Sequence, residues 1–131
     1  MRRGVLFVSP SREDATVLSH MLRSVSTSLH HVDDLQHARA IMQGEPYQVV
    51  LTEANLPDGN WRDVLDLAQK TQPASEVIVT DASADARFWA EALNLGAYDL
   101  IAQPFYEPEV RRILYNACSR PSYQQLPMAA V

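Results

Sequence analysis

The chain has 131 residues, of which 47% are hydrophobic, and it carries a formal net charge of −5. This length is enough for one domain with a hydrophobic core and too short for two. The acidic balance and the scattering of the eleven basic residues argue against a surface that binds phosphate backbones. We therefore expect one domain that binds no nucleic acid.

No segment of the chain predicts export or membrane insertion. The N-terminal apolar run is too short for a signal peptide, and no run approaches the roughly eighteen apolar residues of a membrane span. The single cysteine, Cys118, cannot form an internal disulfide and is expected to be a packing residue. These features predict a cytoplasmic protein with no membrane partner.

Short apolar runs alternate with segments of helical periodicity along most of the chain. The runs that predict strands are residues 4–8, 28–32, 48–52, 76–80 and 98–102. The segments that predict helices are residues 12–25, 35–43, 61–70, 85–95 and 107–119. Strands that are apolar on both faces and alternate with amphipathic helices predict a doubly wound α/β fold, with helices on both sides of a parallel sheet.

The predicted domain covers residues 1–120. Residues 121–131 begin with a proline and lack periodicity, so we expect a loose tail or the start of a linker. In a doubly wound sheet the functional crevice lies at the carboxyl ends of the strands. The residues that follow the predicted strands there are Ser9, Pro10, Ser11, Glu53, Thr80, Asp81, Gln103 and Pro104.

Glu53 is the most informative of these residues, because a carboxylate at the end of an apolar strand is costly to desolvate unless it is paired. Such an acid marks a site or the remains of one. The segments LTEANLPDG, VIVTDAS and NLGAYDLIAQPF, together with their order and spacing, resemble the receiver domain of two-component response regulators over roughly residues 4–119. The resemblance implies a (βα)5 flavodoxin-like three-layer sandwich whose five-stranded parallel sheet has the order 2-1-3-4-5.

The resemblance also implies a phosphorylation switch. In the family, an aspartate that ends strand three accepts a phosphoryl group, and acids that end strand one help to hold Mg²⁺. A threonine or serine after strand four and a lysine after strand five contact the phosphoryl oxygens. In this chain the acceptor position falls on Glu53, the acidic pair on Ser9 and Pro10, the hydroxyl on Thr80 and the lysine on Gln103. Only the threonine is retained.

These replacements remove chemistry that the switch needs. Mg²⁺ prefers six hard oxygen ligands and is usually anchored by carboxylates, so Ser9 and Pro10 predict weak or absent Mg²⁺ binding and no cofactor. A lysine would supply about 4 kcal/mol at about 4 Å with an effective dielectric near 20, where Gln103 offers only a neutral hydrogen bond. Glu53 displaces its carboxylate by more than about 1 Å relative to aspartate, which can cost about a hundredfold in rate.

The role of Glu53 itself stays open between two alternatives. Glu53 imitates a phosphorylated aspartate if it reaches the Thr80 hydroxyl, although it carries about one negative charge where a phosphate carries nearly two. Otherwise it is a plain structural acid. Asp81 would raise the pKa of one of the two carboxyls if it approached Glu53 rather than solvent. The remaining pocket neighbours are Asn55, Pro57 and Pro104.

Other chemistry-bearing residues predict no further site and no enzyme. Ser9 and Ser11 lack histidine and acid partners in the pattern, and they do not sit in a nucleophile elbow, which argues against hydrolase chemistry. The histidines have no metal-ligand spacing, so we expect no metal site. They are His20, His30, His31 and His37.

The output face implied by the family is made by helix four, strand five and helix five. An aromatic residue on strand five takes part in the family's switch, but counting back three from Gln103 places Leu100 there. Trp61 and Trp89 are both expected to be half-exposed at helix starts. Candidate interface residues are Phe88, Trp89, Tyr98 and Tyr115. The implied partners are a histidine kinase, an output protein and a second copy of the chain.

Two functions remain. The preferred one is a receiver-like signalling module that acts through protein–protein interaction independently of phosphorylation. The alternative is a working receiver that a histidine kinase phosphorylates on a non-standard carboxylate, which would be Glu53, Asp58 or Asp81.

Overall fold

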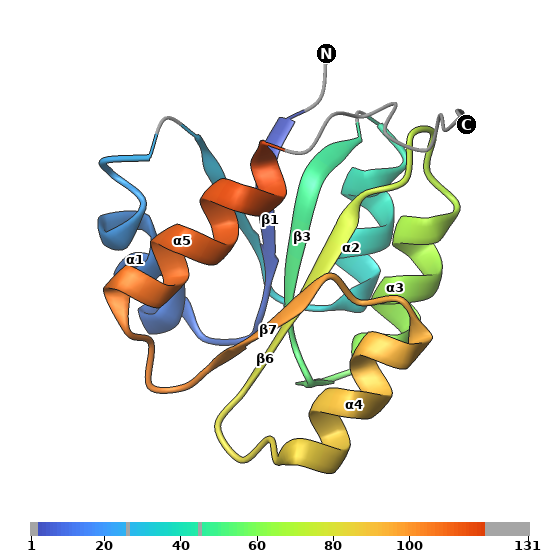
Figure 1. Ribbon diagram of the computed structural model, residues 1–131. Helices are drawn as coiled ribbons and strands as arrows, with labels where there is room; N and C mark the ends of the chain where they lie inside the picture. Colours follow the sequence, from blue (N-terminus) through green and yellow to red (C-terminus); the bar gives the residue numbers. More distant parts are fainter. Residues whose placement is uncertain (1–2, 26, 45, 120–131) are drawn as a thin grey trace, which may run out of the picture.

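A five-stranded parallel sheet forms the centre of the computed structural model, which describes residues 3–25, 27–44 and 46–119 (Figure 1). The strands of this sheet are β1 (Arg3–Val8), β2 (Leu29–Val32), β3 (Tyr47–Glu53), β6 (Glu76–Asp81) and β7 (Asp99–Ala102). They lie in the order β2-β1-β3-β6-β7. This order corresponds to 2-1-3-4-5 for the five predicted strands, so the predicted topology is confirmed.

Helices cover both faces of the sheet and complete the predicted three-layer sandwich (Figure 1). One face carries α1 (Arg12–Met21) and α5 (Glu107–Cys118). The other carries α2 (Leu35–Met42), α3 (Trp61–Gln69) and α4 (Ala86–Leu95). Neighbouring residues of a strand enter opposite core layers, as the two-residue period of a strand requires, and in β1 Leu6 packs on the α2 side and Phe7 on the α1 side.

Four of the five helices in the described residues begin at polar side chains that accept hydrogen bonds from the first free backbone N–H groups, and α5 has no such cap. Ser11, Asp34, Asn60 and Asp85 cap α1, α2, α3 and α4 in this way. Gly96 ends α4 with a φ of 117°, a left-handed conformation that glycine adopts without steric cost. Local sequence chemistry therefore sets most of the helix boundaries.

Helix α1 is shorter than its apolar periodicity predicts. It ends at Met21 rather than near Val25, because the Val25 N–H donates to Leu22 O at 3.0 Å in a tight turn. Leu22 still enters the core and Val25 packs against it. Apolar spacing alone does not distinguish the end of a helix from a turn that continues the same buried stripe.

The LPDG segment joins β4 (Asn55–Leu56) and β5 (Gly59–Asn60), which form a short antiparallel ladder. Asp58 at its tip accepts hydrogen bonds from Leu35 N at 2.9 Å and from Gln36 N at 3.0 Å. A Cβ at position 59 would meet Asp63 Oδ2 at 2.7 Å and Leu35 Cδ2 at 2.8 Å, so a larger residue there would require these side chains to shift. The ladder therefore ties the β3–α3 connection to the first turn of α2.

No helix in the three described ranges is long and apolar enough to cross a membrane. Cys118 packs against the α1 and α5 side of the core, as expected. The prediction of a loose tail over residues 121–131 lies outside the described residues.

Candidate functional site

The polar residues that follow four of the strands meet at the carboxyl edge of the sheet, the lower edge in Figure 1. Glu53 lies opposite Thr80 in the register of β3 and β6. Ser9 follows β1 and Gln103 follows β7. Parallel strands bring their carboxyl ends to one edge, which is why these four residues come together. We call Ser9, Glu53, Thr80 and Gln103 the strand-end network.

The half-buried Glu53 carboxylate is the centre of this network. Its Oε2 atom accepts hydrogen bonds from Ser9 Oγ at 3.2 Å and from Gln103 Nε2 at 3.1 Å. Gln103 Nε2 also donates to Thr80 Oγ1 at 3.1 Å. The Thr80 hydroxyl in turn donates to Ile101 O at 2.7 Å. Glu53 therefore reaches Thr80 through the Gln103 amide and not by a direct hydrogen bond.

Ser9 is fixed by contacts of its own at the end of β1. Its Oγ accepts a hydrogen bond from Ser11 N at 3.0 Å. Its carbonyl oxygen lies 2.7 Å from His31 Nε2. His31 also lies 3.6 Å from Asp33 Oδ1, on the edge of the sheet formed by β2. With the Ser11 N–H bound to its oxygen, the Ser9 hydroxyl donates its proton to Glu53.

The electrostatics of the site disfavour additional negative charge. Burial raises the pKa of Glu53 above its usual value, while hydrogen bonds from Gln103 and Ser9 act in the opposite direction. The nearby Asp14 carboxylate raises the pKa of Glu53 further. Asp14 was missed in the sequence because it follows no strand. The available signal was its place in the first turn of α1, above the same edge of the sheet.

Comparison with known proteins now identifies the family. The family model described as the response regulator receiver domain matches residues 5–115. The chain belongs to this family. The predicted resemblance is therefore confirmed, and the chain is a receiver domain of the kind that takes part in two-component signal transduction.

One curated relative and two solved structures illustrate the likeness. The receiver domain is 24% identical over 116 residues to response regulator protein PilR of Pseudomonas aeruginosa, a match that covers 88% of this chain and 26% of PilR. It matches the signal receiver domain of a protein described as a Luxo repressor from Vibrio parahaemolyticus with a TM-score of 0.80 at 21% identity, over 89% of this chain and 93% of that chain. It also matches the beryllofluoride-activated NtrC4 receiver domain dimer with a TM-score of 0.80 at 23% identity. This match covers 89% of this chain and 96% of that chain.

These comparisons fix the fold and the family but not the activity of a whole protein. The chain spans about a quarter of the length of PilR. At the identities of the solved structures, the likeness shows the fold alone.

The residues at the end of β1 do not fit the Mg²⁺ site that the family implies. The Ser9 hydroxyl donates its proton to Glu53, and the exposed Pro10 has no side-chain oxygen. Mg²⁺ needs several oxygen ligands at near-octahedral angles. Within the described part of the chain, no group of three or more His, Cys, Asp or Glu residues is placed to hold a metal ion.

The two other acids considered as phosphate acceptors are engaged elsewhere. Asp81 Oδ2 accepts hydrogen bonds from Ser83 N at 3.1 Å and from Ser83 Oγ at 3.2 Å. Both carboxylate oxygens of Asp58 cap α2. The carboxylate that raises the pKa of Glu53 is that of Asp14. Of the two alternatives left open for Asp81, the structure shows the one in which it does not approach Glu53 but bonds to Ser83.

The remaining candidates lie around the strand-end network or in the core beneath it. The side chains of Asn55, Pro57 and Pro104 are exposed at the rim. Leu100, at the position of the family's aromatic, is 3% exposed and packs on the α4 side of the sheet. This position is therefore occupied by a core side chain.

The aromatic residues near α4 divide into buried and exposed ones. Trp61 is 5% exposed, so the expectation that it is half-exposed was wrong. Its ring contacts Phe88 edge-on at 5.7 Å, and the Arg62 guanidinium lies 5.5 Å from its ring centroid. Phe88, one of the candidate interface residues, is partly buried and packs against the core. Trp89 is 44% exposed, as expected.

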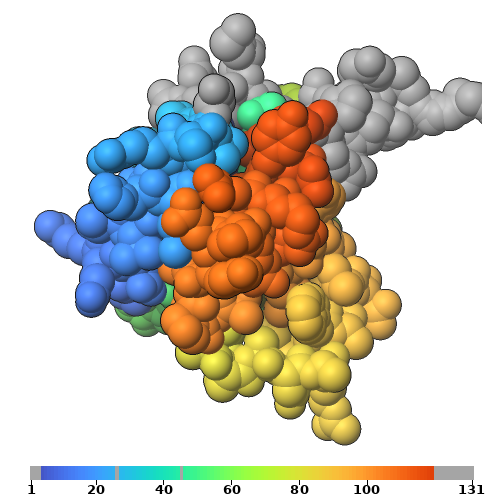
Figure 2. All heavy atoms as spheres, turned by 60° about the vertical axis from the view of Figure 1, so that its left-hand side comes forward, coloured from blue at the N-terminus to red at the C-terminus, as the bar shows by residue number. Residues whose placement is uncertain are grey.

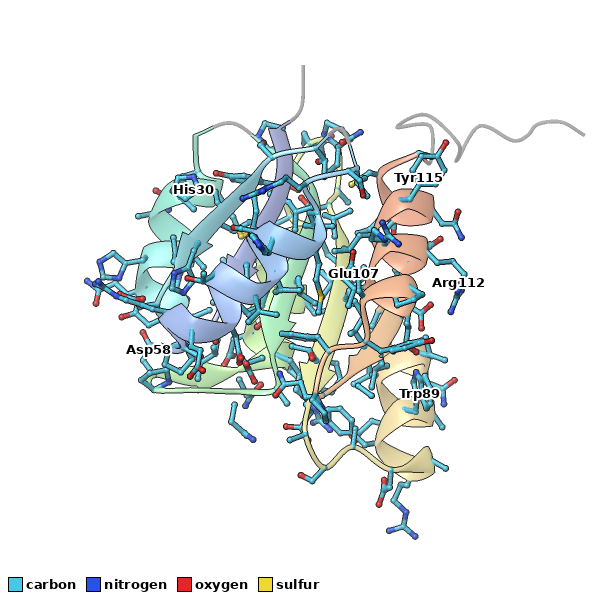
Figure 3. The ribbon with its side chains drawn as sticks, turned by 90° about the vertical axis from the view of Figure 1, so that its left-hand side faces the viewer. His30, Asp58, Trp89, Glu107, Arg112 and Tyr115 are labelled. Carbon is cyan, nitrogen blue, oxygen red and sulfur yellow. The ribbon has the colours of Figure 1, made fainter. Side chains whose placement is uncertain are left out.

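Helices α4 and α5 each carry one exposed aromatic side chain. Figure 3 shows Trp89 on α4 and Tyr115 on α5 on the same side of the molecule. Tyr115 is 60% exposed, whereas Tyr98 is half-buried against the α5 side of the core. In Figure 2, α5 (orange) lies between α1 (blue) and α4 (yellow).

Proposed function

We propose that this receiver domain signals through protein–protein contacts without being phosphorylated. The observation that carries the proposal is the occupied Glu53 carboxylate, whose Oε2 atom already accepts hydrogen bonds from Ser9 and Gln103. A phosphoryl transfer to this oxygen would disturb both hydrogen bonds. No compensating charge comes from Gln103, which is neutral.

The local charge supports the same proposal. A phosphoryl group adds about 1.5 to 2 negative charges near neutral pH. The Asp14 carboxylate already raises the pKa of Glu53, which means that negative charge is disfavoured at this position. The family would offset the added charge with a metal ion and a lysine. In this chain a serine, a proline and a glutamine take the places of those groups.

The proposal extends to the finer points of the function. Mg²⁺ binding is weak or absent, and the domain catalyses no phosphoryl transfer of its own. It acts in the cytoplasm, and its partners are signalling proteins, either a histidine kinase or an output protein. Trp89 and Tyr115 are the exposed aromatics available on α4 and α5. The NtrC4 receiver domain is a dimer, which supports homodimerisation of this chain, and the surface proposed for it is that of α4, β7 and α5.

A beryllofluoride titration tests the proposal. Beryllofluoride with Mg²⁺ imitates a phosphoryl group. Trp61 lies near the site, since its backbone N–H donates to Ala54 O at 3.0 Å, next to Glu53. A Trp89→Phe background leaves Trp61 as the only tryptophan. We expect its fluorescence to stay flat as Mg²⁺ and beryllofluoride are added.

The positive control restores the family residues in the same background, as Ser9→Asp, Pro10→Asp, Glu53→Asp and Gln103→Lys. This variant should give a saturable fluorescence change, because it again offers carboxylates to Mg²⁺ and a cation to the ligand. A saturable change in the unrestored protein would refute phosphorylation-independent function.

A further inference from the structure

A chain of hydrogen bonds begins at α1 and runs along the carboxyl edge of the sheet. The Ser11 N–H donates to Ser9 Oγ at 3.0 Å, and the Ser9 hydroxyl donates to Glu53 Oε2 at 3.2 Å. A serine hydroxyl has one proton, which is used here on Glu53, and its oxygen remains free to accept. The direction of every bond in this first half is therefore fixed.

The second half of the chain runs from Glu53 to β7 through a single amide group. Gln103 Nε2 donates to Glu53 Oε2 and to Thr80 Oγ1, both at 3.1 Å. A carboxamide nitrogen has two N–H donors, and both are used here. The Thr80 hydroxyl then donates its only proton to Ile101 O at 2.7 Å. Gln103 is the one side chain that joins the two halves.

We propose that Gln103 is a positioning residue that locks the carboxyl edge of this receiver domain in one arrangement. The proposal deepens the proposed function, on which it rests, by naming how the site is held without a phosphoryl group. The locked elements are the ends of β1, β3, β6 and β7, which lead into α1, α3, α4 and α5. The surface that a partner meets on α4 and α5 is then held in a single state.

The strength of the lock comes from the charge on Glu53. Hydrogen bonds to charged groups are stronger than those between neutral groups, and loss of one leaves the partly buried acceptor unsatisfied. Opening the edge of the sheet breaks two bonds of Gln103 together. We therefore expect removal of the amide to increase local opening about tenfold or more, without unfolding the domain.

Gln103→Leu tests the lock, because leucine keeps much of the side-chain volume and has no donor. Hydrogen exchange of the Ser11 and Ala54 amides should accelerate about tenfold or more in this variant. Relaxation dispersion of the Leu100 methyl groups should appear as the edge moves between two states. Both amides report on the edge, since Ser11 N donates to Ser9 Oγ and Ala54 N donates to Thr80 O at 3.0 Å.

Two further variants make the result specific. Gln36→Leu applies the same substitution to an exposed glutamine on α2 and should leave both readouts as in the parent protein. Gln103→Lys restores N–H donors and should return exchange to within about twofold of the parent. Unchanged exchange and flat dispersion in Gln103→Leu would overturn the lock.

The outcome is independent of the beryllofluoride titration. If the titration is flat and hydrogen exchange in Gln103→Leu is unchanged, the positioning role of Gln103 is refuted. The proposal of phosphorylation-independent function is then unaffected. A saturable titration with accelerated exchange removes the proposed function and shows that Gln103 holds the edge in a receiver that still binds the phosphoryl analogue.

Discussion

Glu53 combines burial, hydrogen bonding and a like-charged neighbour in one side chain. Its pKa is raised by burial and by Asp14, and hydrogen bonds from Gln103 and Ser9 limit the rise. The folded state therefore binds a proton at Glu53 more readily than the unfolded chain does. The contribution of Glu53 to the free energy of unfolding is largest below its unfolded pKa of about 4.3 and falls as the pH rises through its folded pKa.

Glu53→Gln should reveal this loss. Glutamine does not titrate, so the variant should not lose this stability. Its free energy of unfolding should therefore increase relative to that of the parent as the pH rises from about 4 to about 7. We expect a relative gain of about 1 kcal/mol or less, because the side chain is only half-buried and solvent screens it. Urea unfolding at a series of pH values measures the difference.

Two controls separate burial from the effect of the neighbour. Glu13→Gln changes an exposed glutamate in the first turn of α1 and should not reproduce the gain at the upper end of this pH range. Asp14→Asn should lower the pKa of Glu53 in the folded state. It should therefore narrow the pH range over which the parent protein loses stability. A pH dependence that Glu53→Gln leaves unchanged would show that Glu53 titrates alike in the folded and unfolded states.

Among the elements, the β4–β5 ladder connects parts of the fold that are distant in sequence. Asp58 accepts hydrogen bonds from Leu35 N and Gln36 N, the first two backbone groups of α2. In Figure 3, Asp58 lies near the lower end of the sheet, on the side of α1 and α2. The residue thus serves as a helix cap supplied by another part of the chain, and its carboxylate is not free for phosphoryl chemistry.

Asp58→Ala should lower the free energy of unfolding by about 1 to 2 kcal/mol, the usual cost of removing a capping side chain. Asp66→Ala is the matched control, because Asp66 makes only an exposed pair with Lys70 at 3.0 Å. Its effect should stay within about 0.5 kcal/mol. Chemical denaturation measures both variants, and equal losses would mean that the cap does not support α2.

The positions of the strands and helices were predictable from the sequence where they depend on apolar periodicity and on capping residues, because both are properties of neighbouring residues. Apolar runs placed the strands, and Gly44 and Gly96 placed two helix ends within a residue or two. The end of α1 was not predictable, because a turn at Leu22 keeps the same apolar face buried. The burial of Trp61 depends on Phe88, which lies on a different helix, and no local pattern encodes that contact.

At the scale of the whole molecule, the site and the candidate partner surface are separate. The strand-end network lies at the carboxyl edge of the sheet, while Trp89 and Tyr115 lie on α4 and α5 (Figure 3). Thr80 and Gln103 connect the two, because the chain continues from them toward α4 and α5. A change at the edge can therefore reach the partner surface through two elements.

The assembly of the site was predictable because parallel strands bring their ends together. Strand order and the residues after each strand were enough to place Ser9, Glu53, Thr80 and Gln103 at one edge. The hydrogen-bond directions were not predictable, since they depend on side-chain rotamers. Asp14 was missed for a related reason, because its approach to Glu53 depends on how α1 packs over the sheet.

Intact-mass spectrometry after treatment with acetyl phosphate and Mg²⁺ tests the central claim most directly. The chain should keep its mass, because no acid at the edge combines a free oxygen with a metal site and a cation. The variant with Ser9→Asp, Pro10→Asp, Glu53→Asp and Gln103→Lys should gain the mass of one phosphoryl group under the same conditions. A gain of one phosphoryl group in the unaltered chain, localised by fragmentation to Glu53, would contradict phosphorylation-independent function.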